Sequence, residues 1–294
     1  MNGVLVIDKP AGPTSHDVVA AVRRSIAIER IGHTGTLDPL ATGVLPLVVG
    51  RATRLASFLS GVDKEYEARV KFGASTATYD AEGEVTPVPL PGTIDAHAVQ
   101  KTLPDFVGTY WQMPPPFSAK KVDGTPAYKL ARRHKPVELK PVEVTVRQIE
   151  LRGFTNDVAD VHLVCSSGFY VRSLAHDLGE RLECGAYLER LRRTRAGSFS
   201  LTDAAPLDVI VQEGPLAVSR LIPIDRLLPE LPAVVLNEQG VRRAAHGNAL
   251  GRGDVLEPPT RIGNRLRLVD GAGTLLGIAE PLESGLLHPV VVLV

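Results

Sequence analysis

A glycine-rich loop that carries one carboxylate is the part of this sequence best suited to chemistry. Residues 32–45 read GHTGTLDPLATGVL, and their three glycines and one proline predict a long loop. Within this loop, Pro39 disfavours the α region for Asp38 and holds it extended. A carboxylate presented in this way can act as a nucleophile, a general base or a metal ligand, or it can simply satisfy its own turn backbone.

Three other side chains have types and spacings that could assist such a carboxylate. Tyr170 and Arg172 are two residues apart in a segment that we expect to be strand-like, so both side chains should point the same way. A guanidinium on that face can pair with a carboxylate and hold it ionised; the alternative is an exposed arginine beside a half-buried tyrosine. His33, five residues before Asp38, belongs either to the same site or to the loop backbone.

Two basic clusters stand out on a chain whose 33 Lys and Arg balance its 33 Asp and Glu. Residues 190–195 read RLRRTR, and residues 114–147 hold eight Lys or Arg against three Asp or Glu. Arginine suits bidentate contacts with phosphate, so both clusters predict contact with an anionic partner such as nucleic acid. The alternative is a charged surface that contacts only solvent.

The composition and motifs argue against several kinds of chemistry for this chain. Cys165 and Cys184 are the only cysteines and have no flanking His or Cys cluster, so we expect two buried thiols and neither a disulfide framework nor a zinc site. The sequence holds no GxxxxGK[ST] or GxGxxG loop, and we expect no nucleotide cofactor and no metal. The absence of a signal peptide and of an apolar run of about 18 residues predicts a soluble cytoplasmic protein.

The elements that must position these residues follow from hydrophobic periodicity and turn signals. The pattern predicts strands over residues 3–8, 66–73 and 158–166, and helices over 15–26, with Ser15 as N-cap, and over 173–183. Recurrent prolines over 205–232 indicate a boundary, and residues 233–294 read as the short strands of a small β-barrel or sandwich. From the residues alone, a two-domain enzyme acting on RNA or a phosphate-bearing substrate and a non-catalytic RNA-binding module both remain open.

Six motifs, in order along the chain, closely resemble those of the bacterial TruB tRNA pseudouridine synthases. They are residues 3–12 (GVLVIDKPAG), 32–45, 64–85, 114–132, 168–180 and 184–199. The resemblance implies an α+β pseudouridine synthase fold, with a mixed, mainly antiparallel sheet flanked by helices and loops and a small β domain at the C-terminus. It further implies a catalytic domain over 1–230, an RNA-gripping insertion over 114–147, and a PUA-like RNA-binding domain over 231–294.

The resemblance also implies an activity and a role for individual residues. The family isomerises uridine 55 in the TΨC arm of tRNA, breaking the N1–C1′ bond and making a C5–C1′ bond. By their positions in the motifs, Asp38 is the nucleophile, Arg172 its partner, and Tyr66 the aromatic residue that stacks on the flipped base. The other substrate-binding positions implied are Tyr170, Leu191, His33, Asp80 and Lys9. The basic residues expected to contact the RNA backbone are Arg190, Arg192, Arg193, Lys120, Lys121 and Arg132.

These implied roles agree with the physical chemistry of the reaction. A base must leave its stack before its atoms can be reached, and Tyr66 offers a stacking face worth about 1–3 kcal/mol. In a dry pocket we expect Arg172 to keep Asp38 anionic, at a depressed pKa. The expected partner is the tRNA TΨC stem-loop, bound by a monomer without a guide RNA, a membrane or a cofactor. The alternatives are a non-catalytic tRNA-binding chaperone and a guide-RNA-dependent synthase of the archaeal and eukaryotic type.

Overall fold

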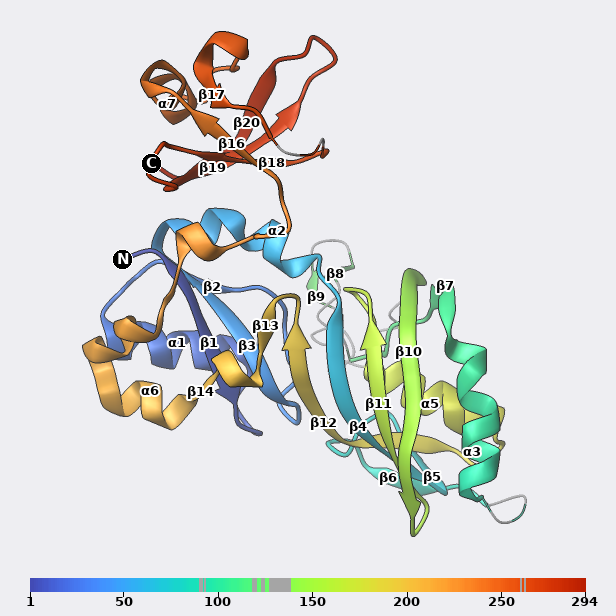
Figure 1. The fold of residues 1–294 in the computed structure, drawn as a ribbon. Coiled ribbons are helices and arrows are strands. Elements are labelled where there is room, and N and C mark those ends of the chain that lie inside the picture. Colours follow the sequence, from blue (N-terminus) through green and yellow to red (C-terminus); the bar gives the residue numbers. More distant parts are fainter. Residues whose placement is uncertain are drawn as a thin grey trace.

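The protein is built around one large mixed sheet, shown in Figure 1. The computed structural model describes residues 1–89, 92, 94–117, 121–122, 125–126, 139–259, 261 and 263–294. The main path of the sheet runs β14 (Ala205–Pro206), β1 (Gly3–Lys9), β3 (Thr42–Val49), β12 (Ala186–Ala196), β4 (Lys64–Phe72), β11 (Val158–Cys165), β10 (Val142–Thr155) and β7 (Gly108–Gln112). Its neighbouring strands are antiparallel except for the pairs β14–β1 and β3–β12.

Shorter strands and helices complete this part of the chain. The strands are β2 (Ile31–His33), β13 (Phe199–Ser200) and β15 (Ile222–Pro223) beside the main sheet, and the two-stranded pairs β5 (Ala74–Thr76) with β6 (Val85–Pro87) and β8 (Lys121–Val122) with β9 (Thr125–Pro126). The helices are α1 (Ser15–Ile26), α2 (Ala56–Ser60), α3 (Ala96–Thr102), α5 (Val171–Arg181) and α6 (Leu207–Glu213). The predicted α+β class, with a mainly antiparallel sheet, is confirmed.

The central strand β4 separates the two faces of the sheet by simple alternation. Tyr66, Ala68 and Val70 are buried in the large apolar core that also includes residues of α1 and α5. Glu65 and Glu67, at the intervening positions, lie on the opposite face, as the period of two in a strand requires. The alternation therefore places Tyr66 on the face of the sheet that the helices cover.

Strand β12 runs through the arginine-rich segment and meets the end of the glycine-rich loop. It pairs in parallel with β3 at Arg192–Thr42 and Arg193–Gly43. Gly43 has φ +100°, and a Cβ at this position would lie 2.2 Å from the backbone oxygen of Arg193. Only glycine permits this approach without a shift of the backbone. The glycine therefore fixes where the loop that carries Asp38 rejoins the sheet.

Helix α1 begins one residue away from the predicted cap. Thr14, not Ser15, is the N-cap, and its side chain forms a reciprocal capping box with Asp17. Ser15 is thereby free to make a different contact: its buried hydroxyl accepts from the Leu37 N–H at 2.8 Å and donates to the Leu37 carbonyl at 3.0 Å. The start of α1 thus holds the residue that precedes Asp38.

The C-terminal segment forms a second sheet, drawn in orange and red in Figure 1. Its strand order is β17 (Val255–Glu257), β16 (Ala233–Leu236), β18 (Leu266–Val269), β19 (Leu275–Pro281) and β20 (Leu287–Val292), with helix α7 (Glu238–Ala245) beside it. The strands lie at or beside the positions expected from the sequence, whereas α7 was not expected. No helix in the described ranges is both long and apolar enough to span a membrane.

One apolar cluster is shared by the two sheets. It combines Val6 and Leu55 of the N-terminal part with Ile278 and Leu293 of the C-terminal part, and each of these side chains is buried. Leu227, from the segment that connects the two parts, fills the same cluster. The C-terminal sheet is therefore packed against the main part of the protein and not merely tethered to it.

Candidate active site

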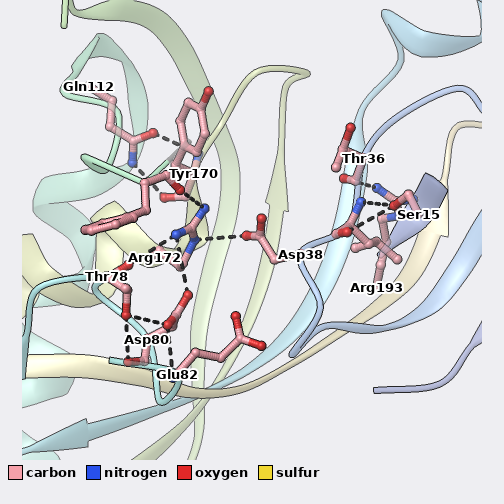
Figure 2. Close-up of polar contacts among 12 residues, drawn as sticks. Ser15, Thr36, Asp38, Thr78, Asp80, Glu82, Gln112, Tyr170, Arg172 and Arg193 are labelled. Carbon is pink, nitrogen blue, oxygen red and sulfur yellow. Dashed lines mark hydrogen bonds and ion pairs between the residues drawn. The ribbon is translucent and has the colours of Figure 1, made fainter. Parts of the chain in front are cut away.

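The carboxylate of Asp38 and the guanidinium of Arg172 form a close ion pair at the centre of the candidate site, shown in Figure 2. The Oδ2 atom of Asp38 lies 2.9 Å from the Nε atom of Arg172. Asp38 comes from the loop between β2 and β3, whereas Arg172 comes from the first turn of α5. The structure thus joins two residues that are 134 positions apart in the sequence.

The guanidinium of Arg172 is held from several sides, and its side chain is only 6% exposed. It donates to the carbonyl oxygen of Thr78 at 3.2 Å and to that of Phe117 at 3.0 Å, and it lies 3.4 Å from the Asp80 carboxylate. The Asp80 carboxylate accepts in turn from the Thr78 hydroxyl and from the Glu82 backbone N–H. Because these partners come from separate segments, the guanidinium has little freedom to turn away from Asp38.

The local structure around Tyr170 differs from the expectation of an extended strand. Tyr170 is the N-cap of α5, and Arg172 lies inside the helix. The prediction of a strand-like pair was therefore wrong, because the helix begins two residues earlier than its apolar stripe indicates. Tyr170 and Arg172 still line the same cavity, since Tyr170 lies at the helix entrance and Arg172 in its first turn.

A cavity of about 280 Å³ opens above the ion pair. Five of the residues predicted to be catalytic or to bind the substrate line it: Asp38, Tyr66, Tyr170, Arg172 and Leu191. Lys64 and Arg193 line it as well, so the cavity wall carries three cationic groups. Its volume is close to the lower end of the range of small-molecule sites, about 300 Å³, and its walls are both apolar and polar. Within the described ranges, no group of three or more His, Cys, Asp or Glu is arranged to hold a metal ion.

The surroundings of Asp38 shift its pKa in the direction opposite to the one expected. Desolvation by the surrounding protein raises the pKa of the Asp38 carboxyl above its ordinary value, and the neighbouring Asp80 adds to this effect. Arg172 and Lys9 act in the opposite direction but do not outweigh the loss of water. The predicted depression of the pKa was therefore wrong, because it considered the ion pair without the cost of burying the charge.

Lys9 supports the loop that carries Asp38 and does not line the cavity. Its side chain is fully buried, and its ammonium group donates to the carbonyl oxygens of Pro10, Pro39 and Ala41 at 2.9, 3.1 and 2.7 Å. Burial lowers the pKa of Lys9 to about 8. The structure contradicts the prediction that Lys9 contacts the substrate, because its three donors are already used by the backbone of Pro10 and of two residues that follow Asp38, Pro39 and Ala41.

Arg193 holds the same loop from the other side. It is 1% exposed and donates to the carbonyl oxygens of Val44 at 2.7 Å, Gly35 at 3.2 Å and Thr36 at 3.5 Å. The structure contradicts the prediction that Arg193 contacts the RNA backbone, since a buried guanidinium bonded to the loop cannot reach a phosphate. Its neighbour Arg192 faces the opposite side of the sheet and forms an ion pair with Asp8 at 2.8 Å.

The remaining predicted site residues are either exposed, partly buried or outside the described residues. Arg190 is exposed on β12 and accessible to an anion. His33 is partly buried, its Nδ1 atom has no hydrogen-bond partner within the described part of the chain, and burial lowers its pKa. Lys120 and Arg132 lie outside the described residues, as does the side chain of Lys121.

Sequence reasoning missed several residues that build the site. Ser15 and Thr78 hold the Asp38 loop and the Asp80 carboxylate, and Gln112 bonds to the backbone of Tyr170. Ser15 and Gln112 have neither a charge nor a spacing that would give them a role in the site. Thr78 could have been noticed, because it lies two residues before Asp80 in a polar turn.

Solved structures with the same architecture define the class of this fold. The crystal structure of a Cbf5-Nop10-Gar1 complex superimposes with a TM-score of 0.74 at 25% identity, covering 95% of this chain and 78% of that chain. A structure of an H/ACA ribonucleoprotein bound to a substrate RNA containing 2′-deoxyuridine gives the same TM-score at 24% identity, covering 99% and 83%. The fold, with its aspartate and arginine at one cavity, is that of a pseudouridine synthase.

Sequence comparisons narrow this class to one family. Residues 23–171 match the model of the TruB family pseudouridylate synthase N-terminal domain, residues 172–228 that of the tRNA pseudouridylate synthase B C-terminal domain, and residues 232–293 that of the pseudouridine synthase II TruB C-terminal domain. The tRNA pseudouridine synthase B of Solibacter usitatus is 42% identical over the whole of both chains. That of Opitutus terrae is 45% identical over 79% of this chain and 96% of its own. The chain belongs to the TruB family.

Proposed function

We propose that this pseudouridine synthase isomerises uridine 55 in the TΨC arm of tRNA, with Asp38 as its nucleophile. The observation that carries the proposal is the Asp38 carboxylate, which faces a 280 Å³ cavity while Arg172 holds it at 2.9 Å. The relatives in Solibacter usitatus and Opitutus terrae are named tRNA pseudouridine synthase B, which supports tRNA as the substrate. The position within the tRNA is proposed from the resemblance of the motifs.

The geometry supports a division of tasks among the residues that line the cavity. The target uridine leaves its stack and enters the cavity, where the ring of Tyr66 offers a stacking face and Leu191 an apolar contact. The N1–C1′ bond breaks, the base turns and a C5–C1′ bond forms; C5 then loses its proton and N1 gains one, so that the product is an isomer of the substrate. Asp38 supplies the negative charge for this reaction, and Arg172 keeps that charge directed into the cavity.

A non-catalytic tRNA-binding chaperone is the competing function. Binding alone gains nothing from a carboxylate in an RNA-facing cavity, because RNA is itself an anion and like charges repel. The pair of Asp38 and Arg172 therefore favours the enzyme. The buried supports of the loop, Lys9 and Arg193, favour it as well, since they donate to the backbone of the loop that carries the carboxylate.

Replacement of Asp38 by asparagine separates the two functions. For Asp38→Asn we expect the affinity for tRNA to be retained and pseudouridine formation to fall by at least about 10³-fold, because the nucleophile is gone. Pseudouridine in the tRNA is mapped after incubation with the purified protein. Asp105→Asn is the matched control, since Asp105 also pairs with an arginine at 2.8 Å but is exposed and remote from the cavity. Isomerisation by Asp38→Asn at the wild-type rate would show that Asp38 is not the nucleophile.

We also propose that the protein acts alone, as a cytoplasmic monomer that needs no guide RNA. On this proposal residues 1–230 form the catalytic domain, with 114–147 as the RNA-gripping insertion, and residues 231–294 form a PUA-like domain that adds RNA contacts. The exposed cation of Arg190 on β12 supports binding to a polyanion. Activity of the purified protein on a transcript of the TΨC stem-loop, at the sedimentation coefficient of a monomer, is the expected result. A requirement for an added RNA or protein would contradict it.

A further inference from the structure

The side chain of Gln112 pairs with the backbone of Tyr170 through two hydrogen bonds. Its Oε1 atom accepts from the Tyr170 N–H at 2.9 Å, and its Nε2 atom donates to the Tyr170 carbonyl oxygen at 3.0 Å. Gln112 is the last residue of β7 and is only 1% exposed. Figure 2 shows the carboxamide on the opposite side of the Tyr170–Arg172 segment from Asp38. The two bonds join residues that are 58 positions apart.

These bonds lie at the start of a helix that has no side-chain cap of its own. Tyr170 is the N-cap of α5, and its own side chain makes no capping bond. Its carbonyl oxygen accepts the first helical bond, from the Leu174 N–H at 3.2 Å, in addition to the bond from Gln112. A buried backbone N–H without a partner is destabilising. The Gln112 carboxamide therefore fixes the backbone from which Arg172 extends, two residues further on.

Further bonds connect the same two segments. The Ser173 hydroxyl donates to the Met113 carbonyl oxygen at 2.7 Å, and the guanidinium of Arg172 donates to the Phe117 carbonyl oxygen at 3.0 Å. Residues 112–117 thus contact three positions around the start of α5: Tyr170, Arg172 and Ser173. Of these contacts, only the Gln112 bonds come from a side chain of the 112–117 segment, and Gln112 does not line the cavity. A substitution can therefore remove them without altering any group that faces the substrate.

We propose that Gln112 is a positioning residue for the isomerisation: it holds the Tyr170–Arg172 backbone so that the Arg172 guanidinium stays against Asp38. This proposal rests on the proposed function, because it assigns the effect to the ion pair of the candidate active site. A displacement of about 1 Å in a group that orients a reactant can cost about 10²-fold in rate. Loss of the two Gln112 bonds leaves Arg172 in the helix but frees the backbone that directs it.

Gln112→Met tests the proposal, because methionine keeps the length of the side chain and removes both bonds. We expect the single-turnover rate of pseudouridine formation to fall by about 10- to 100-fold. The tRNA dissociation constant should stay within about twofold, since the residue does not face the RNA, whereas a general loss of structure would weaken binding too. The acid limb of the rate profile should move to higher pH, because a displaced guanidinium no longer opposes the raised pKa of Asp38. Gln148→Met, on the exposed face of β10, is the matched control and should match wild type in all three measurements.

A double substitution shows whether Gln112 acts through Arg172. In an Arg172→Lys background, which has already lost the guanidinium, Gln112→Met should lower the rate by less than about twofold further. If Gln112→Met is unfolded at the assay temperature, Gln112→Glu is measured in its place. The Gln112→Glu side chain keeps the acceptor for the Tyr170 N–H but loses the donor to the Tyr170 carbonyl oxygen. For this variant we expect a loss of rate smaller than that for Gln112→Met. A folded Gln112 variant with the wild-type rate and pH profile, or an equal loss in both backgrounds, would overturn the proposal. An inactive wild-type enzyme would instead refute the proposed function, so the two failures are distinguishable.

Discussion

At the level of single residues, two opposing effects set the charge of Asp38. The protein around the carboxyl removes water and favours its protonated form, while Arg172 and Lys9 favour the ionised form. Desolvation is the larger effect. The ion pair therefore limits the cost of burying the charge, and it does not make Asp38 a stronger acid than a solvated aspartate. This balance has a direct consequence for the dependence of the reaction on pH.

We expect an acid limb in the pH profile of kcat/KM whose midpoint lies above 3.8, the ordinary pKa of an aspartate. On the proposed role of Asp38 the reaction needs the ionised carboxylate, and a raised pKa means that protonation begins at higher pH as the solution is acidified. Below the midpoint, the rate should fall about tenfold for each pH unit. The measurement is a series of rates on the TΨC stem-loop from neutral to acidic pH. A midpoint at or below 3.8 would contradict the assigned environment.

The sequence identified the residues that line the cavity better than the residues that support it. Asp38, Tyr66 and Arg172 stand in motifs, and the structure brings all three to one cavity. Lys9 and Arg193 stand in motifs too, but their type alone suggests contact with an anion. Only the packing reveals that their partners are backbone carbonyls, because burial of a side chain depends on segments far away in the sequence.

At the level of elements, β12 shows what a period of two can and cannot predict. Had residues 190–195 been interpreted as a strand, alternation would have placed Arg192 and Arg193 on opposite faces. Even so, two bulges in β12 each shift its register against β4 by one residue. One lies between Leu188 and Arg190 and the other between Arg193 and Arg195. Such irregularities depend on the neighbouring strand and are not encoded in a local pattern.

Two arginines of β12 should therefore respond differently to substitution. Arg193→Met leaves the carbonyls of the Asp38 loop without a donor, so the free energy of unfolding should fall by about 1–3 kcal/mol. Arg190→Met removes an exposed cation, so stability should change by less than about 0.5 kcal/mol. In tRNA titrations at several salt concentrations, the slope of log K against log[salt] should become shallower by about one for Arg190→Met only. A shallower slope for Arg193→Met would show that this arginine does meet phosphate.

The start of helix α5 is another feature that a local sequence pattern does not predict. Its apolar stripe begins at Leu174, which is why the sequence predicted a start at residue 173. The true first turn includes Arg172 and is held by Gln112 from β7. Because the N-cap side chain of α5 makes no capping bond, the helix gives no capping signal in its own sequence, and its start could not be located by local reasoning.

At the level of the whole molecule, the shared apolar cluster makes the two sheets dependent on each other. The strand pattern of residues 233–294 could be predicted, because turns and alternation are local. The packing of Ile278 and Leu293 against Val6 and Leu55 could not, because no local pattern shows which faces meet. A buried contact between the sheets predicts that they unfold together and not as independent units.

Ile278→Ala tests this dependence. Ile278 is fully buried in the shared cluster, and its truncation should lower the free energy of unfolding by about 2–5 kcal/mol. The single tryptophan of the chain, Trp111, lies on β7 of the main sheet, so its fluorescence reports on that sheet alone. In urea titrations, the Trp111 midpoint should shift together with the circular dichroism. Leu256→Ala, at an exposed position of β17, is the control and should leave the midpoint unchanged. A Trp111 midpoint that stays in place for Ile278→Ala would show that the sheets are independent.

The two cysteines have a practical consequence for work with this enzyme. Cys165 and Cys184 are both fully buried, and burial raises the pKa of the Cys165 thiol to about 12 and that of the Cys184 thiol above its ordinary value. The native surface described here thus offers no reactive sulfur of its own. A cysteine introduced at an exposed position can then be coupled to a maleimide dye in the otherwise unmodified protein, so that the motions of the enzyme on its RNA can be followed by energy transfer between dyes.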